Sequence, residues 1–183
     1  INKIMDNEEF RWKYSPYITS AHKKKATQQK EPDYIFYMVH ALLIMISTET
    51  SVKGAKTVIM KENDPKVVRS SFLEILDPEL EKCEQIGLNN CVRAKCNMYP
   101  YTETLSEHEF HIDGNFPHTA AILSLNTCDG YTIFETGEKV DSIANRLSIV
   151  DGTIFHASTN TTNAKARFNI NFKILFHILF TIF

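Results

Sequence analysis

The stretch "FHIDGNF", residues 110–116, places a histidine and an aspartate two positions apart in an apolar segment that ends in a turn. In a β-strand, side chains at positions i and i+2 point to the same face, with Cα atoms roughly 6.5–7 Å apart. The imidazole of His111 and the carboxylate of Asp113 can therefore converge on one metal ion. The alternative is a solvated strand face, so the metal hypothesis depends on further ligands elsewhere in the chain.

Short β-prone runs surround this stretch from Cys91 onward. Turn signals such as Asp129-Gly130 and Asp151-Gly152 separate them, and several strands at this spacing are typical of a β-sandwich or barrel. The runs are "CVRAKCNMY", "HEFHID", "HTAAILSLN", "GYTIFET", "RLSIVD", "TIFHAS" and "ARFNINFKI".

The first half of the chain is predicted to be less rich in strands. Residues 64–87 read as two helical segments separated by Asp77-Pro78, and residues 20–31 form a polar, lysine-containing loop. The apolar run 34–47 is compatible with a buried helix or with two strands, because its hydrophobic periodicity does not distinguish between the two. We therefore predict one α+β, mainly β domain over residues 1–183, with N-terminal helices packed against a sandwich.

A third metal ligand is available at His156, in the strand-like run "GTIFHAS". Two histidines and one carboxylate form the facial triad of non-haem Fe(II) oxygenases, although zinc accepts the same ligands. Arg167, which opens the apolar run "RFNINFKI", favours the first option. A guanidinium at the start of a buried strand needs an anion, and its planar fork fits a carboxylate, such as that of a cosubstrate.

Taken in order, these residues resemble a known family. His111-x-Asp113, "LSLN" (123–126), "DGYTIFETG" (129–137), "NRLSIVDG" (145–152), His156 and Arg167 resemble the core of Fe(II)/2-oxoglutarate-dependent dioxygenases, most closely the prolyl-4-hydroxylase-like branch with its small viral and phage members. The resemblance implies a double-stranded β-helix (jelly-roll, cupin-like) core over residues 91–174. Residues 1–90 would then be a helical and loop region that supports it.

The resemblance also implies roles for individual residues. His111, Asp113 and His156 would bind Fe(II), 2-oxoglutarate would chelate the iron, and Arg167 would hold its distal carboxylate. Tyr99, in "MYP", matches a tyrosine that commonly hydrogen-bonds the cosubstrate, but it could equally be an aromatic at the edge of the core. Asn97 is a weaker candidate on the same strand face, and the Asn-x-Tyr pair also resembles nucleic-acid demethylases of the same superfamily.

Two departures from the family pattern affect the surroundings of Arg167. Ser124 stands where many prolyl hydroxylases carry a tyrosine, and its shorter hydroxyl reaches less far. Asp129-Gly130 replaces the usual Gly-Gly turn. Neither change touches the iron ligands, but the first leaves the polar partner of Arg167 open, with Tyr99 and Ser124 as the candidates.

Composition points to a soluble protein whose function lies in a site rather than in bulk charge. The net charge is −2, which provides no overall attraction to nucleic acid or to an anionic membrane. The four cysteines are too few and too irregular for a secreted disulfide framework, so a reducing, cytoplasmic location is expected (host cytoplasm for a viral protein). The apolar runs 34–47 and 172–183 are too short to span a membrane, and the second is expected to pair with a sheet or a partner.

The leading hypothesis is an Fe(II)- and 2-oxoglutarate-dependent dioxygenase that uses O₂ to hydroxylate a prolyl or other residue of a peptide, with release of succinate and CO₂. A nucleic-acid demethylase of the same superfamily is less favoured, because the single basic run provides few positive charges for binding a nucleic-acid backbone. A zinc-dependent hydrolase explains the triad but leaves Arg167 and Tyr99 without a shared ligand. A non-catalytic jelly-roll binding module would have little reason to keep both the metal ligands and the arginine. The oligomeric state is open.

Overall fold

A computed structural model describes residues 10–15, 37–44, 48–52, 55–59, 68–70, 72–78, 81, 85 and 91–175. Twelve strands and one short 3₁₀ helix are defined among these residues. In chain order they are β1 (Lys13–Ser15), β2 (Tyr37–Ile44), β3 (Thr48–Val52), β4 (Ala55–Ile59), β5 (Val68–Arg69), η1 (Leu73–Leu76), β6 (Cys91–Pro100), β7 (Thr119–Ser124), β8 (Tyr131–Phe134), β9 (Lys139–Asp141), β10 (Leu147–Asp151), β11 (His156–Ser158) and β12 (Ala166–Ile174).

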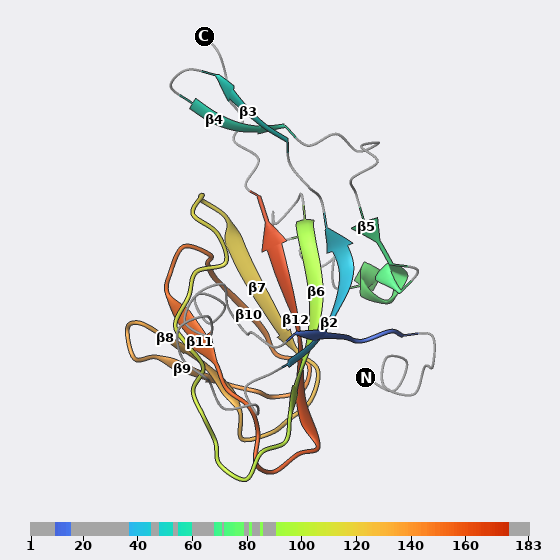
Figure 1. Cartoon of the computed structure of the whole chain (residues 1–183), viewed down its shortest axis with the longest axis vertical. Coiled ribbons are helices and arrows are strands. Elements are labelled where there is room, and N and C mark those ends of the chain that lie inside the picture. The colour runs from blue at the N-terminus through green and yellow to red at the C-terminus, as the bar shows by residue number, and fades with distance from the viewer. Residues whose placement is uncertain are drawn as a thin grey trace.

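Two antiparallel sheets form the core, and a separate hairpin lies at one end of the molecule (Figure 1). The main sheet has the order β1-β2-β6-β12-β7-β10, with β5 paired to β2. The small sheet has the order β11-β8-β9, and β3 pairs with β4 alone. Side chains from both core sheets line one cavity, so the sheets face each other. This is a jelly-roll sandwich with a mainly β core, as predicted.

The strands of the main sheet have one apolar and one polar face. Alternate residues of β6 and β12 follow this pattern, because successive side chains of a strand point to opposite faces. The apolar face is covered by residues from the N-terminal segment, β2 and η1, including Phe10, Leu42 and Leu76. The sheet residues in this core are Ala94, Cys96, Ala121, Leu123, Ile170, Phe172 and Ile174. The opposite, polar face is therefore free to line a functional site between the sheets.

The N-terminal region differs from the predicted helical and loop support in one respect: its described residues contribute strands to the main sheet. Part of the apolar run 34–47 is strand β2, which pairs with β6 and settles the choice between helix and strand for residues 37–44. Within the stretch 64–87, predicted to be helical, the described residues form the short strand β5 and the 3₁₀ helix η1, and residues 77, 78, 81 and 85 are α-helical. Burial against the sheet explains the difference, since an apolar run beside the central strand β6 gains ladder hydrogen bonds as a strand.

Some predictions fall partly or wholly outside the described residues. These include the loop 20–31, Cys83 and residues 176–183 of the apolar C-terminal run, whereas residues 172–174 complete β12. Cys91, Cys96 and Cys128 are free thiols. No helix within the described part of the chain is long and apolar enough to cross a membrane.

Candidate metal centre

The structure brings His111, Asp113 and His156 together. One potential ligand atom from each residue lies within 4.8 Å of the others. The backbones of His111 and His156 bond each other reciprocally, at 2.9 and 3.0 Å, although 45 positions separate them in the chain. The two imidazole centroids are consequently 4.7 Å apart. The three side chains are therefore candidate ligands of one metal ion.

Backbone carbonyls orient both imidazoles. Nδ1 of His111 lies 3.2 Å from the carbonyl oxygen of Glu109, and Nδ1 of His156 lies 3.0 Å from that of Ile154. A carbonyl oxygen only accepts, so each Nδ1 carries the proton and donates it. When such a ring is neutral, its lone pair is on Nε2, which is the arrangement that metal-binding histidines use.

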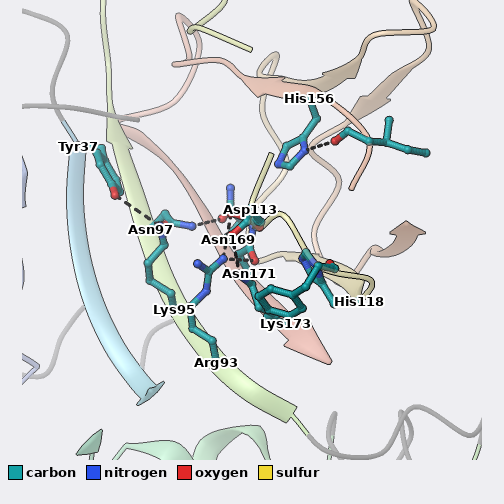
Figure 2. Close-up of polar contacts among 12 residues, drawn as sticks. Tyr37, Arg93, Lys95, Asn97, Asp113, His118, His156, Asn169, Asn171 and Lys173 are labelled. Atoms are coloured by element: carbon teal, nitrogen blue, oxygen red, sulfur yellow. Dashed lines mark hydrogen bonds and ion pairs between the residues drawn. The ribbon is translucent and has the colours of Figure 1, made fainter. Parts of the chain in front are cut away.

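The carboxylate of Asp113 is held by side chains of the main sheet (Figure 2). Nη2 of Arg93 lies 3.0 Å from Oδ1, and Nδ2 of Asn171 donates to Oδ2 at 3.0 Å. Nζ of Lys173 donates to the Asp113 backbone oxygen at 2.6 Å. Each carboxylate oxygen has two lone pairs, so one remains on each oxygen for a metal. Arg93, Asn171 and Lys173 thus fix the position of the acidic ligand.

The pKa shifts in this cluster favour a charged Asp113 carboxylate and a neutral His111 imidazole. Burial would raise the pKa of Asp113, but attraction and hydrogen bonding by Arg93 outweigh it and hold this pKa well below its ordinary range. Burial, followed by repulsion from His156, lowers the pKa of His111. Burial and the neighbouring Arg93 also lower the pKa of Lys173, to about 8. A charged carboxylate beside a neutral imidazole is the state in which both act as ligands.

A cavity of about 30 Å³ adjoins the three residues. Its lining comes from β2, β6, β7 and β12 of the main sheet and from β8 and β11 of the small sheet, together with His111 and Asp113. Ile122 is the sole aliphatic side chain among the described residues that line it. Such a polar lining suits a small ligand rich in oxygen atoms.

Paired polar residues on β6 and β12 form the floor of the site. In the antiparallel register, Arg167 lies opposite Tyr99, Asn169 opposite Asn97, Asn171 opposite Lys95 and Lys173 opposite Arg93. All eight residues share the face that points away from the apolar core. This face therefore presents three lysine or arginine side chains near the carboxylate of Asp113, with Arg167 at the far end.

Arg167 is almost completely buried, at 1% exposure. Its Nη1 donates to the carbonyl oxygens of Tyr131 at 2.7 Å and Thr159 at 3.2 Å, and its Nη2 donates to Oγ1 of Thr132 at 3.0 Å. Its Nε is also buried but has no hydrogen-bond partner within the described structure. Burial lowers the pKa of Arg167. A buried cation with an unsatisfied donor is costly, so an anionic partner would stabilise it.

Gly130 makes room for this arginine. A Cβ atom at this position would lie 2.5 Å from the carbonyl oxygen of Asn160 and 2.8 Å from Cδ of Arg167. The glycine of the Asp129-Gly130 turn is therefore needed for close packing. The Asp129 carboxylate accepts hydrogen bonds from Thr161 and Thr162. These bonds join the Asp129-Gly130 turn to the segment that follows β11.

The predicted site residues of the polar face differ in their relation to the cavity: Tyr99 and Asn97 line it, whereas Arg167 and Ser124 do not. Tyr99 lines the cavity and its ring lies 5.8 Å from Cζ of Arg167; burial raises its pKa to about 12, so its phenol stays neutral. Asn97 also lines the cavity and donates to Oδ1 of Asn169 at 2.8 Å. Ser124 is buried opposite Asn169 in the β7–β12 register but is not among the lining residues. Thr132 is the hydroxyl partner of Arg167.

Sequence reasoning did not single out Arg93, Lys95, Asn171, Lys173 or Thr132. The available signal was alternation: polar residues occupy every second position in "RAKCNMY" and "RFNINFK". Such alternation predicts a polar strand face. It does not say that the two faces are paired or that they meet Asp113.

No family model matches this chain, and no curated protein sequence matches it either. Solved structures do. The chain is similar to an oxidoreductase of the 2OG-Fe(II) oxygenase family from Burkholderia pseudomallei, with a TM-score of 0.55, 13% identity, and coverage of 92% of this chain and 87% of the other.

Two further neighbours have TM-scores below 0.5. They are a prolyl-4-hydroxylase from Pseudomonas putida (TM-score 0.45, 10% identity, 91% and 92% coverage) and a cupin protein from Bacteroides fragilis (TM-score 0.35, 10% identity, 55% and 79% coverage). At these identities the comparisons concern the fold alone. The chain has the jelly-roll fold of the 2OG-Fe(II) oxygenase structure, with a His-Asp-His cluster beside the cavity between its sheets.

Proposed function

We propose that this protein is an Fe(II)- and 2-oxoglutarate-dependent dioxygenase that hydroxylates a residue of a peptide or protein. The observation that carries the proposal is Arg167, a buried guanidinium with an unpartnered Nε. It lies on the sheet face whose Arg93 and Asn171 contact Asp113 of the His-Asp-His cluster. The cluster alone would fit zinc as well as iron. The arginine adds the need for a carboxylate, which a hydrolytic water does not meet.

Each chain residue has a separate task in this proposal. His111, Asp113 and His156 would hold the metal from one side and leave its other positions open. Arg167 would pair with the distal carboxylate of 2-oxoglutarate, while Thr132 and the carbonyl groups of Tyr131 and Thr159 keep the guanidinium in place. The neutral phenol of Tyr99 would donate a hydrogen bond to 2-oxoglutarate. When bound, iron and cosubstrate supply the oxidation: one oxygen atom of O₂ enters a substrate C–H bond as a hydroxyl and the other enters succinate, with loss of CO₂.

The cavity size sets a condition on this proposal. A volume of about 30 Å³ suffices for about two water molecules, which is less than 2-oxoglutarate occupies. Binding of the cosubstrate therefore requires lining side chains to move outward. Direct measurement of binding is accordingly more decisive than turnover alone.

The test is an anaerobic titration of the protein with Fe(II) and then 2-oxoglutarate, followed by exposure to O₂ and measurement of succinate. We expect saturable binding of both ligands and slow succinate formation without a second substrate. Asp113→Ala should abolish metal binding and succinate formation together. Hydrolytic activity with zinc, combined with no binding of 2-oxoglutarate, would replace this proposal with that of a hydrolase.

A further inference from the structure

One cation at the cavity has no role in the proposed metal and cosubstrate sites. Lys95 lines the cavity from β6, and its Nζ lies 3.4 Å from the hydroxyl of Tyr37 and 5.3 Å from the centroid of that ring (Figure 2). Among the described lining residues, Asp113 provides the carboxylate, and Arg93 already holds it at 3.0 Å. Lys95 acts on the charge of Asp113 from a distance but forms no ion pair within the described part of the chain, so it presents a positive charge to the cavity.

Lys95 and Arg167 lie on different sides of Tyr99. Strand β6 runs between β2 and β12 in the main sheet. From β2, the ring of Tyr37 stacks on Tyr99 at 5.6 Å, and from β12, Arg167 approaches the same ring at 5.8 Å. Because Lys95 reaches toward Tyr37, the Tyr99 side chain separates the two cations. A single small carboxylate held by Arg167 would not also satisfy Lys95.

Asn97, next to Lys95 on the same strand face, has a buried oxygen that accepts no hydrogen bond from the described residues. It is 2% exposed and lines the cavity, and its Nδ2 donates to Asn169. Its Oδ1 is buried and accepts no hydrogen bond from any described residue. Lys95 and Asn97 are two positions apart on one strand face, so the cavity presents a cation and an orphan acceptor side by side. A ligand that satisfies both carries a negative charge and an N–H or O–H donor.

We propose that Lys95, Tyr37 and Asn97 form the subsite for an acidic residue of the peptide substrate, with the carboxylate on Lys95 and Tyr37 and an N–H of the same residue on Asn97. This inference rests on the proposed function and makes its substrate more specific: the residue held beside the metal is aspartyl or glutamyl rather than prolyl. A proline has neither the charge nor, within a peptide, the N–H.

A peptide fits this subsite better than the phosphate of a nucleic acid. A phosphodiester offers acceptors only, so it would leave the Oδ1 of Asn97 unpaired. The subsite contains one ammonium group, and the whole chain has a net charge of −2, whereas nucleic-acid binding depends on many cations along the backbone. The peptide supplies the charge and the donor from adjacent atoms.

The test uses three peptides that differ at one position, acetyl-Gly-Gly-Xaa-Gly-Gly-amide with Asp, Asn or Pro as Xaa. Each is titrated by calorimetry into the full chain loaded with Mn(II) and 2-oxoglutarate without oxygen. We expect the Asp peptide to bind at least about tenfold more tightly than the other two. Lys95→Met should weaken it by about 10- to 100-fold, as expected for loss of a charged hydrogen bond, with 2-oxoglutarate affinity unchanged within about twofold.

Matched variants distinguish a specific loss of Asp-peptide affinity from general destabilisation of the fold. Lys165→Met removes an exposed lysine just before β12 and should leave Asp-peptide affinity unchanged. Lys95→Gln keeps a polar side chain should Lys95→Met fail to fold, and it should also abolish the preference for Asp over Asn. Arg167→Met should have the opposite pattern, with weaker 2-oxoglutarate binding and an intact preference for Asp.

Several outcomes would overturn the inference. Equal binding of the three peptides, or no binding of the Asp peptide, would remove the acidic-residue subsite. Weaker 2-oxoglutarate binding in Lys95→Met would make Lys95 the cosubstrate anchor, and Lys95-dependent binding of a single-stranded DNA oligonucleotide would assign the subsite to phosphate. If wild type fails to bind 2-oxoglutarate but still binds the Asp peptide through Lys95, the dioxygenase proposal fails and the subsite stands.

Discussion

Arg93 of the central strand β6 and Asp113 of the candidate metal cluster form an ion pair of 3.0 Å, with side-chain exposures of 23% and 9%. Removing one partner of a buried pair leaves a desolvated charge, which costs about 3–5 kcal/mol. Because Arg93 is partly exposed, we expect Arg93→Met to lower the free energy of unfolding by about 2–3 kcal/mol. Urea denaturation of the metal-free protein at pH 7 measures this change.

An exposed ion pair provides the control. Lys139 and Glu107 lie 3.1 Å apart with exposures of 47% and 40%, so Lys139→Met should have a much smaller effect. If Arg93→Met and Lys139→Met destabilise the protein equally, Arg93 does not carry the positioning of Asp113. In the double variant Arg93→Met/Asp113→Asn, much of the loss should be recovered, because the uncompensated carboxylate is gone.

Tyr99 makes stability depend on alkaline pH. Burial raises its pKa to about 12, although Ser158 and Arg167 act in the opposite direction. An unfolded tyrosine titrates near pH 10, so the folded state keeps a proton that the unfolded state loses. The contribution of Tyr99 is therefore fully present below pH 10 and declines as the pH rises toward 12. We expect a loss on the order of 1 kcal/mol at pH 11 relative to pH 9.

The measurement compares the pH dependence of unfolding in wild type and Tyr99→Phe. Phenylalanine keeps the ring against Tyr37 and Arg167 but has no proton to lose. Its stability should fall less steeply between pH 9 and pH 11, whatever its absolute value. Parallel curves for the two proteins would mean that Tyr99 is accessible to hydroxide in the folded state.

The strand pattern of the second half predicts the jelly-roll core because its signals are local. Alternation in "CVRAKCNMY" and "RFNINFKI" marks one apolar and one polar face, and both runs are strands in the structure. The spacing of His111 and Asp113 likewise indicates convergence, since it depends only on the repeat of a strand. Their meeting with His156 came from the order of motifs in a resembling family, and the structure brings the three together.

Other contacts depend on register between distant strands, which a single sequence does not contain. Arg93 meets Asn171, 78 positions away, because β6 pairs with β12, and both side chains contact Asp113. Thr132 contacts Arg167 from the opposite sheet, 35 positions away, whereas the sequence alone indicates Tyr99 and Ser124 as candidate partners. The apolar run 34–47 remained undecided for the same reason: its conformation follows from a neighbouring strand. Local periodicity predicts faces, and pairing decides which faces meet.

Gly130→Ala should impair the site through Arg167. The added Cβ would lie 2.5 Å from the Asn160 carbonyl oxygen and 2.8 Å from Cδ of Arg167, so the arginine must shift. We expect a loss of about 1–3 kcal/mol in stability, as for other overpacked positions, together with weaker 2-oxoglutarate binding. Metal affinity should change little, because the metal ligands lie elsewhere.

Gly137→Ala is the matched control for this variant. Gly137 has φ of 86° and open space around its Cβ position, so alanine costs about 1–2 kcal/mol in backbone strain without crowding a neighbour. Both alanine variants should therefore be destabilised, but only Gly130→Ala should weaken cosubstrate binding. Equal effects on 2-oxoglutarate would mean that the loss follows general destabilisation rather than the position of Arg167.

Arg167 provides the most direct test of cosubstrate identity. Its Nη groups are held by Thr132 and two carbonyl oxygens, while its buried Nε remains without a described partner. If this donor serves a carboxylate, Arg167→Ala removes one member of a buried charge pair worth about 3–5 kcal/mol, and the dissociation constant of 2-oxoglutarate should rise by roughly 10²–10³-fold. Calorimetry with Mn(II)-loaded protein under anaerobic conditions measures it.

Conservative changes around Arg167 distinguish recognition of a carboxylate from packing. Arg167→Lys keeps the charge but lacks the planar fork, so it should recover only part of the affinity. Thr132→Val removes one hydroxyl that holds Nη2 and should weaken 2-oxoglutarate by a smaller factor, about 5- to 15-fold. Mn(II) affinity should stay within about threefold of wild type in all three variants, because none of them touches His111, Asp113 or His156. Unchanged 2-oxoglutarate affinity in Arg167→Ala would mean that the guanidinium binds only groups of the protein itself and no cosubstrate carboxylate. The preference for iron over zinc would then lose its main support.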